Sequence, residues 1–137
     1  MNKILHAVVL TVATSALLWG CGKDETVVKP VSFAAEVAPI LKANCLECHT
    51  PEGKGYEASG LLMVDAANPA EVSYEALMKG TKFGPIIVPG DSTSSALNML
   101  VEGRADPSIK MPHGKDALTP EQLAALKQWV EQGAQKN

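Results

Sequence analysis

Aromatic residues are scarce in this chain of 137 residues: two Trp, two Tyr and two Phe make up 4 % of it. A protein of this length forms one domain, and its interior normally depends on large apolar side chains. With so few aromatic side chains, the polypeptide alone builds only a thin core. The sequence therefore leaves room for a bound group that supplies the missing apolar bulk.

The chain also lacks features that several common functions require. No apolar run reaches the ~20 residues of a membrane-spanning helix. No alternating pattern lasts long enough to predict a sheet, and neither a Gly-rich phosphate loop nor a catalytic triad is present. The formal net charge of −3 argues against a nucleic-acid partner. These absences predict an all-α protein whose chemistry depends on some other motif.

Cysteine is rare too, with three copies, but two of them stand in the motif Cys45-Leu46-Glu47-Cys48-His49. At this spacing, two thiols can form thioether bonds to the two vinyl groups of one haem, and the next histidine ligates the iron. Chance would produce the pattern in about one in a thousand chains of this composition. We therefore expect one covalent haem c, attached at Cys45 and Cys48, with His49 as the proximal iron ligand.

Other interpretations fit these residues less well. A redox-active thiol pair needs a βαβ setting in which a helix N-terminus lowers one thiol pKa, and no parallel-sheet pattern follows the motif. A zinc site would need adjacent ligands, and no second Cys-x-x-Cys or His-x-x-x-His is present. A disulfide between Cys45 and Cys48 would close too small a loop to stabilise the fold much.

The N-terminus has the features of an export signal. A short basic region, Met1 to Lys3, precedes an apolar region from Ala7 to Leu18. The following Trp19-Gly20-Cys21 resembles a lipoprotein cleavage site, although Trp19 departs from the small residue usual there. We expect residues 1–20 to be a lipoprotein-type signal peptide and Cys21 to be the lipidated first residue of the mature chain. An unmodified Cys21 thiol is the alternative.

Residues 21–31 are polar and charged without apolar periodicity, which indicates a lipid-anchored flexible tether. Fully extended, its roughly ten residues reach ~30–35 Å. Haem attachment of this kind occurs outside the bacterial cytoplasm. We therefore expect attachment to a bacterial membrane, the outer membrane being favoured because no Asp follows Cys21. Residues 32–137 would then face the periplasm or the cell exterior.

Helical periodicity predicts four helices within this domain. They cover about residues 32–44, where Pro39 bends or restarts the helix, and then residues 73–79, 92–102 and 120–132. The last has the clearest boundaries: Thr119 and Gln122 form a capping box, Pro120 takes the first helical position, and Gly133 closes it. Its apolar stripe includes Trp129, which we expect in the core beside the first helix.

The loop of residues 106–114 is expected to be rigid and non-helical, and to supply the distal iron ligand. Met111 precedes Pro112, which restricts Met111 to an extended backbone and fixes the direction of its thioether. A thioether favours ferrous iron and raises the reduction potential. His113 is the rival ligand, and without either the iron would be five-coordinate. Apolar contexts predict that the other methionines of the domain fill the core: Met63, Met78 and Met99.

Taken together, these motifs make residues 32–134 similar to a small class I c-type cytochrome domain, closest to the planctomycete-type cytochrome c domain. The matching residues are Phe33 with Val37-Ala38-Pro39-Ile40-Leu41, Cys45 to His49, Ser59-Gly60-Leu61, Val88-Pro89-Gly90-Asp91 with Ser94 and Leu97, Met111-Pro112, Leu118-Thr119 and Trp129 to Ala134.

The resemblance implies a helical domain wrapped around one haem, with crossing N- and C-terminal helices. It also implies iron ligation by His49 and Met111, although His113 stands where such domains often carry a second proline. In class I domains a backbone carbonyl accepts the proximal imidazole N–H. The sequence does not identify that carbonyl here, and Pro85 is a guess.

A covalently held, six-coordinate haem supports one-electron transfer rather than conversion of a substrate. We therefore expect a monomeric electron carrier and not an enzyme, with redox proteins as partners. The acidic excess and the cluster of Glu47, Glu52 and Glu57 favour a basic partner surface. A peroxidase-like enzyme or a haem-based ligand sensor is the alternative, and either would need an open or labile distal position.

Overall fold

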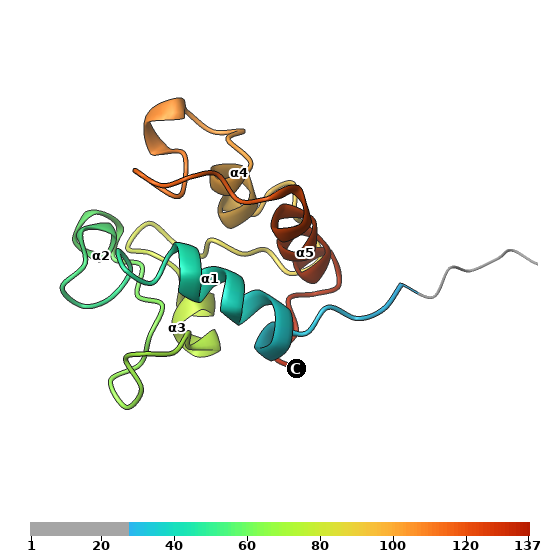
Figure 1. Ribbon diagram of the computed structural model, residues 1–137, viewed down its shortest axis with the longest axis horizontal. Coiled ribbons are helices and arrows are strands. Elements are labelled where there is room, and N and C mark those ends of the chain that lie inside the picture. The colour runs from blue at the N-terminus through green and yellow to red at the C-terminus, as the bar shows by residue number, and fades with distance from the viewer. Residues whose placement is uncertain (1–27) are drawn as a thin grey trace, which may run out of the picture.

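The computed structural model describes residues 28–137, and this part of the chain is helical without any β-strand. Its elements are the π-helix η1 (Phe33–Val37), α1 (Ala38–Asn44), α2 (Lys54–Ser59), α3 (Tyr74–Lys79), α4 (Ala96–Val101), the 3-10 helix η2 (Pro107–Ile109) and α5 (Pro120–Glu131) (Figure 1). The all-α prediction is confirmed at this level. The expected signal peptide, Cys21 and residues 21–27 of the expected tether lie outside the described residues.

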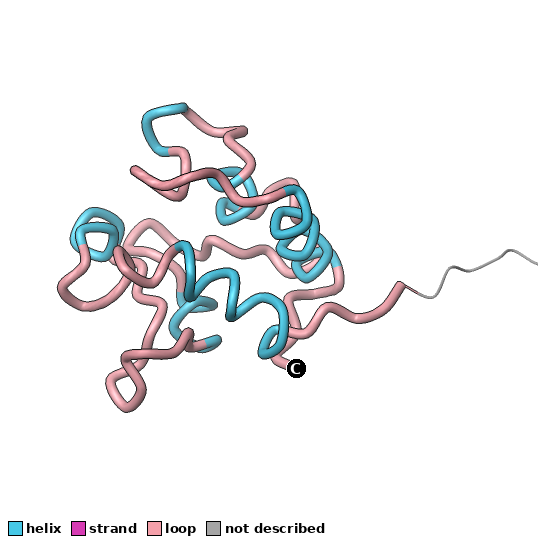
Figure 2. The backbone as a smooth tube through the Cα atoms, in the orientation of Figure 1, coloured by secondary structure: helices cyan, strands magenta, loops and turns pink. Residues whose placement is uncertain are grey.

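Long loops connect these short helices (Figure 2). No helix in residues 28–137 is both long and apolar enough to cross a membrane. The buried apolar side chains form one core, which is made by the first helical segment, the loops around residues 61–64 and 86–87, and α3, α4 and α5.

The first helical segment is divided at the predicted position. Ser32 caps it by accepting a hydrogen bond from the Ala35 N–H, η1 follows, and α1 then starts with Pro39 in its first turn. Proline is tolerated there because the first helical N–H groups have no partner within the helix. At the other end of α1 the Cys45 N–H donates to the Leu41 carbonyl at 2.8 Å. The helix therefore delivers the first cysteine directly from its C-terminus.

Helix α5 also begins as predicted. The Thr119 hydroxyl accepts the Gln122 N–H at 3.3 Å, and the Gln122 side chain accepts the Thr119 N–H at 3.0 Å. Trp129, on the buried face of α5, is fully inaccessible to solvent. Its ring centroid lies 5.5 Å from that of Phe33, which places α5 against η1.

The structure differs from the sequence-based expectations in three helical elements. Helix α4 begins at Ala96 rather than near Ser92, because Asp91 accepts the N–H groups of Thr93 and Ser94 and holds residues 91–94 in a turn. Helix α2 was not expected at all. The loop of residues 106–114 was expected to be non-helical but contains η2, which the Asp106 side chain caps by accepting the Ser108 N–H.

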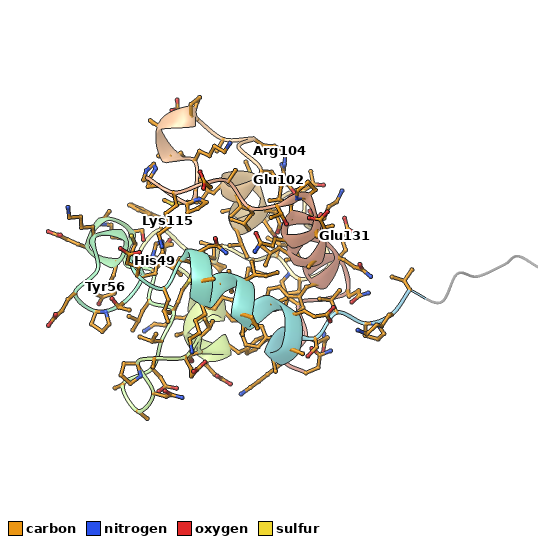
Figure 3. The ribbon with its side chains drawn as sticks, in the orientation of Figure 1. His49, Tyr56, Glu102, Arg104, Lys115 and Glu131 are labelled. Atoms are coloured by element: carbon orange, nitrogen blue, oxygen red, sulfur yellow. The ribbon has the colours of Figure 1, made fainter. Side chains whose placement is uncertain are left out.

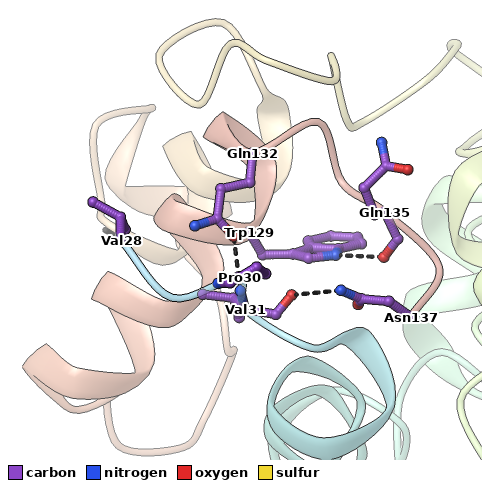
Figure 4. A pocket seen from close by; sticks show the side chains of 7 residues that line it. All are labelled: Val28, Pro30, Val31, Trp129, Gln132, Gln135 and Asn137. Atoms are coloured by element: carbon purple, nitrogen blue, oxygen red, sulfur yellow. Dashed lines mark hydrogen bonds between the residues drawn. The ribbon is translucent and has the colours of Figure 1, made fainter. Parts of the chain in front are cut away.

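The two ends of the described chain lie together (Figure 4). The side chain of Asn137 accepts the Phe33 N–H at 2.7 Å and donates to the Val31 carbonyl at 3.3 Å. Gln132 accepts the Val31 N–H at 2.7 Å. Residues 29–31, the end of the expected tether, are therefore attached to α5.

Candidate functional site

A cavity of about 830 Å³ lies between two walls of the domain, within the range typical of cofactor sites. One wall consists of the end of α1, the Cys-x-x-Cys-His segment, α2 and the loop of residues 81–86. The other consists of α4 and residues 109–115, which appear above α1 and α2 in Figure 1. The lining is mostly apolar, and its charged groups are Lys54 and Lys115.

The Cys-x-x-Cys-His segment forms a tight turn at the end of α1. The Cys48 and His49 N–H groups both donate to the Cys45 carbonyl at 3.1 Å. All three of these residues line the cavity, and the two thiols are free. The turn therefore brings both predicted attachment residues and the predicted proximal ligand to one wall.

His49 is held in place by the loop that follows α2. Its Nδ1 lies 3.2 Å from the Leu61 carbonyl oxygen, and its own carbonyl accepts the Met63 N–H at 2.9 Å. Since a carbonyl can only accept, Nδ1 carries the proton and Nε2 keeps its lone pair. Burial lowers the pKa of His49, and the Leu61 hydrogen bond opposes this effect only in part. Neutral imidazole, the form that ligates metals, is therefore favoured.

Pro85 was the wrong guess for the acceptor of this N–H. The acceptor is the carbonyl of Leu61, twelve residues after His49. Pro85 lines the cavity from a different loop. The signal that could have identified Leu61 is the Ser59-Gly60-Leu61 motif, where Gly60 takes a left-handed conformation (φ 73°) and the Ser59 hydroxyl accepts the Leu61 N–H.

Two glycines pack against the haem-attachment motif and were missed by the sequence analysis. A Cβ on Gly53 would lie 2.2 Å from the Cys48 carbonyl oxygen. A Cβ on Gly55 would lie 2.7 Å from Cε1 of His49. The absence of a side chain at Gly55 therefore lets α2 approach the imidazole ring. A single sequence gives no signal that distinguishes these glycines from turn glycines.

Burial raises the pKa of the Cys45 thiol to about 11, and the nearby ammonium group of Lys115 lowers it only in part. This is the reverse of the lowered pKa that a redox-active Cys-x-x-Cys pair needs. In residues 28–137 no three side chains among His, Cys, Asp and Glu are arranged to hold a bare metal ion. Neither alternative interpretation of the cysteines gains support from the structure.

The opposite wall contains both candidate distal ligands. Met111 is half-buried, and its N–H donates to the Leu100 carbonyl at 3.1 Å, which attaches it to α4. His113 also lines the cavity but is exposed. The structure therefore places both residues at the cavity and does not choose between them. Residues 111 and 112 are joined by a cis peptide bond.

The other methionines of the domain have different places. Met63 is buried and lines the cavity on the His49 side, where its loop also provides the Leu61 carbonyl. Met78 packs against the core, and neither Met78 nor Met99 lines the cavity. Core filling is therefore confirmed for Met63 and Met78, while Met99 is half-exposed on α4.

An ion pair joins the two walls at the cavity. The Lys115 Nζ lies 2.7 Å from Oε2 of Glu47, the residue between the two cysteines. Figure 3 shows Lys115 beside His49, below the loop that carries η2. The contact lowers the pKa of Glu47 and raises that of Lys115, because each charge stabilises the other. Of the acidic cluster Glu47, Glu52 and Glu57, Glu47 is therefore paired with a lysine of the same chain.

The residues present are compatible with a covalent haem. The cavity is large and apolar, both thiols and His49 lie on one wall, and the thioether of Met111, a soft donor, belongs to a residue of the other. The Leu61 carbonyl supplies the outer hydrogen bond that metal-bound histidines usually make. In comparisons with known proteins, no family model, no curated protein and no solved structure matches this chain.

Proposed function

We propose that this protein is a monohaem c-type cytochrome that transfers single electrons. The observation that carries the proposal is that one apolar cavity is lined by Cys45, Cys48 and His49 on one wall and by Met111 on the other. When bound, haem c would supply reversible one-electron chemistry at its iron. In this proposal the fold is the cytochrome c-like domain that the sequence resembles.

Each residue of the proposed haem site has a defined task. Cys45 and Cys48 form the thioethers, and His49 is the proximal ligand, oriented by the Leu61 carbonyl. Met111 is the distal ligand, and its thioether favours the ferrous state. If His49 and Met111 both hold the iron, no position is left for a substrate, so the protein would act as a carrier between redox proteins.

The site opens to solvent where partner proteins could approach. Phe83 and Ile109 both line the cavity, and they are 81 % and 48 % exposed. Exposed apolar side chains at the mouth of a cavity are typical of interaction surfaces. We infer a monomer that exchanges electrons through this face, with its donor and acceptor not yet identified.

The N-terminal sequence supports a proposed location. Cleavage before Cys21 and its acylation would attach the protein to a bacterial membrane, preferentially the outer one, with the domain in the periplasm or outside the cell. Residues 29–31 enter the fold at α5, and α2, which lines the cavity, lies at the other end of the molecule (Figure 1). This arrangement would leave the cavity accessible to partners beside the membrane.

The distal ligand is tested with the purified coloured protein and two variants. Met111→Ala is expected to abolish the sulfur-to-iron charge-transfer band of the ferric protein and to lower the reduction potential. His113→Ala is expected to leave the band in place. An unchanged band in Met111→Ala together with a changed spectrum in His113→Ala would assign ligation to the histidine instead.

Carbon monoxide separates the carrier from the catalytic and sensor alternatives. A six-coordinate iron with Met111 bound binds carbon monoxide slowly, because the thioether must first leave. Rapid binding by the reduced wild-type protein would contradict the carrier and support a haem enzyme or a ligand sensor with an open distal position. The Met111→Ala variant is the positive control for rapid binding.

A further inference from the structure

The segment that follows Met111 has few attachments to the rest of the fold. From residue 112 to residue 117, no backbone hydrogen bond joins the segment to another element of the described structure, and residues 113–114 form a turn of their own. The side chains of this segment make one polar contact, which is the ion pair between Lys115 and Glu47. Residues 112–117 are therefore held at one end by Met111, whose N–H bonds to Leu100 of α4, and at the other by buried Leu118. The ion pair of Lys115 holds the middle.

This one contact joins the two walls beside the cavity. Glu47 does not line the cavity itself, but it lies between Cys45 and Cys48, which do, and Lys115 belongs to the opposite wall. The ammonium group of Lys115 also lies close enough to Cys45 to lower the pKa of its thiol in part. The loop is therefore fixed to the wall at the point where the thioethers are expected to form.

We propose that the ion pair between Glu47 and Lys115 is a latch that holds the distal loop closed and thereby keeps Met111 at its position over the cavity. This inference rests on the proposed function for the role of Met111, but the latch itself is a property of the protein chain. Glu47 and Lys115 are positioning residues in this proposal and do not touch the reacting atoms.

The size of the effect follows from the exposure of the pair. The side chain of Lys115 is 33 % exposed and that of Glu47 is 73 % exposed, so solvent screens their attraction. An exposed pair of this kind changes an opening equilibrium by about two- to five-fold. Such a change has little effect on global stability. It is large enough to measure in the local opening of a loop that has no other polar contact in its middle.

The experiment uses the full-length protein and four variants. Glu47→Gln and Lys115→Met each remove one charge with little change in size. The double variant Glu47→Lys/Lys115→Glu reverses the pair. Glu71→Gln is the matched control, because it removes the carboxylate of another exposed ion pair, with Lys42, whose residues do not line the cavity.

Two measurements report on the latch. Amide hydrogen exchange at Met111, whose N–H donates to the Leu100 carbonyl at 3.1 Å, measures opening of the loop and does not depend on a redox assay. The rate at which saturating imidazole replaces Met111 on ferric iron measures release of the ligand. We expect both rates to rise about two- to five-fold in Glu47→Gln and Lys115→Met, to return toward the wild-type value in the reversed pair, and to stay unchanged in Glu71→Gln.

Salt provides a test on the unmodified chain. At about 1 M salt the screening length falls to ~3 Å, so wild-type exchange at Met111 should rise toward that of Glu47→Gln, while the variant itself changes little. Equal exchange at Met111 in all variants and at all salt concentrations would overturn the latch. A protein without haem would contradict the proposed function instead, since the exchange measurement remains possible in that case.

Discussion

At the scale of single residues, the pKa of Cys45 has a measurable consequence. Burial raises the pKa of this thiol to about 11, so at pH 8 only about one molecule in a thousand carries the thiolate. Iodoacetamide reacts with the thiolate. We therefore expect alkylation of Cys45 in the folded, haem-free chain to be far slower than in the same chain in denaturant, and to rise up to about pH 11. Equal rates in the two states would contradict the buried environment.

Gly55 gives a second prediction at this scale, because two effects of Gly55→Ala have opposite signs. Within α2, alanine is favoured over glycine by ~0.5–1 kcal/mol. However, the added Cβ would lie 2.7 Å from the His49 ring and 2.9 Å from the Cys48 carbonyl oxygen, and overpacking of this kind typically costs ~1–3 kcal/mol. We expect the steric term to dominate, with lower stability in denaturant unfolding and an altered haem spectrum.

The control for Gly55→Ala is Gly90→Ala. Gly90 has a positive φ of 87°, but a Cβ there meets no atom within 4 Å. This variant should lose stability through backbone strain and keep the wild-type spectrum. A Gly55→Ala protein with wild-type stability and spectrum would show that the contact with His49 is unimportant.

The sequence predicted the chemically distinctive residues of the site and missed those that act through the backbone. Cys45, Cys48 and His49 were identified because their spacing is unusual, and Met111 because it precedes a proline in a rigid loop. The structure brings all four to one cavity. Leu61 contributes a carbonyl that every residue has, and its one signal in the sequence is the Ser59-Gly60-Leu61 turn. Gly55 contributes the absence of a side chain, which has no signature in one sequence.

At the scale of the elements, α5 depends on its capping box. Loss of a Thr side chain at a helix N-cap typically costs ~1 kcal/mol. We expect Thr119→Ala to reduce the free energy of unfolding by about this amount in a denaturant titration. Thr93→Ala is the control, because the Thr93 hydroxyl makes no hydrogen bond within residues 28–137, where only its backbone groups are bonded. No loss in Thr119→Ala would mean that packing of Trp129 alone determines where α5 starts.

Helix boundaries were predictable where local chemistry acts alone. Ser73, Pro39 and Thr119 mark helix starts in the sequence and in the structure. The start of α4 was misplaced by about four residues because Asp91 competes for the N–H groups of a potential first turn. Helix α2 has no apolar stripe, and its tertiary contacts include the Tyr56 N–H on the Cys48 carbonyl and the Lys82 N–H on the Ser59 carbonyl, both at 3.0 Å. Those tertiary contacts could not be inferred from periodicity.

At the scale of the whole molecule, the proposed anchor and the cavity should be independent. Cys21→Ser removes the thiol that acylation requires. We expect this variant to move from the membrane fraction to the soluble fraction, while its haem spectrum and its stability stay at wild-type values. A spectrum that changes with Cys21→Ser would contradict this separation, and continued membrane attachment would contradict lipidation at Cys21.

The proposal as a whole depends on a covalent haem at the turn that follows α1. The most direct measurement is the mass of the peptide that contains Cys45 and Cys48, isolated from protein made in a cell competent for cytochrome maturation. We predict that this peptide is red and carries the mass of one haem on its two sulfur atoms. A colourless protein whose peptide has only the mass of its amino acids would contradict the proposed function.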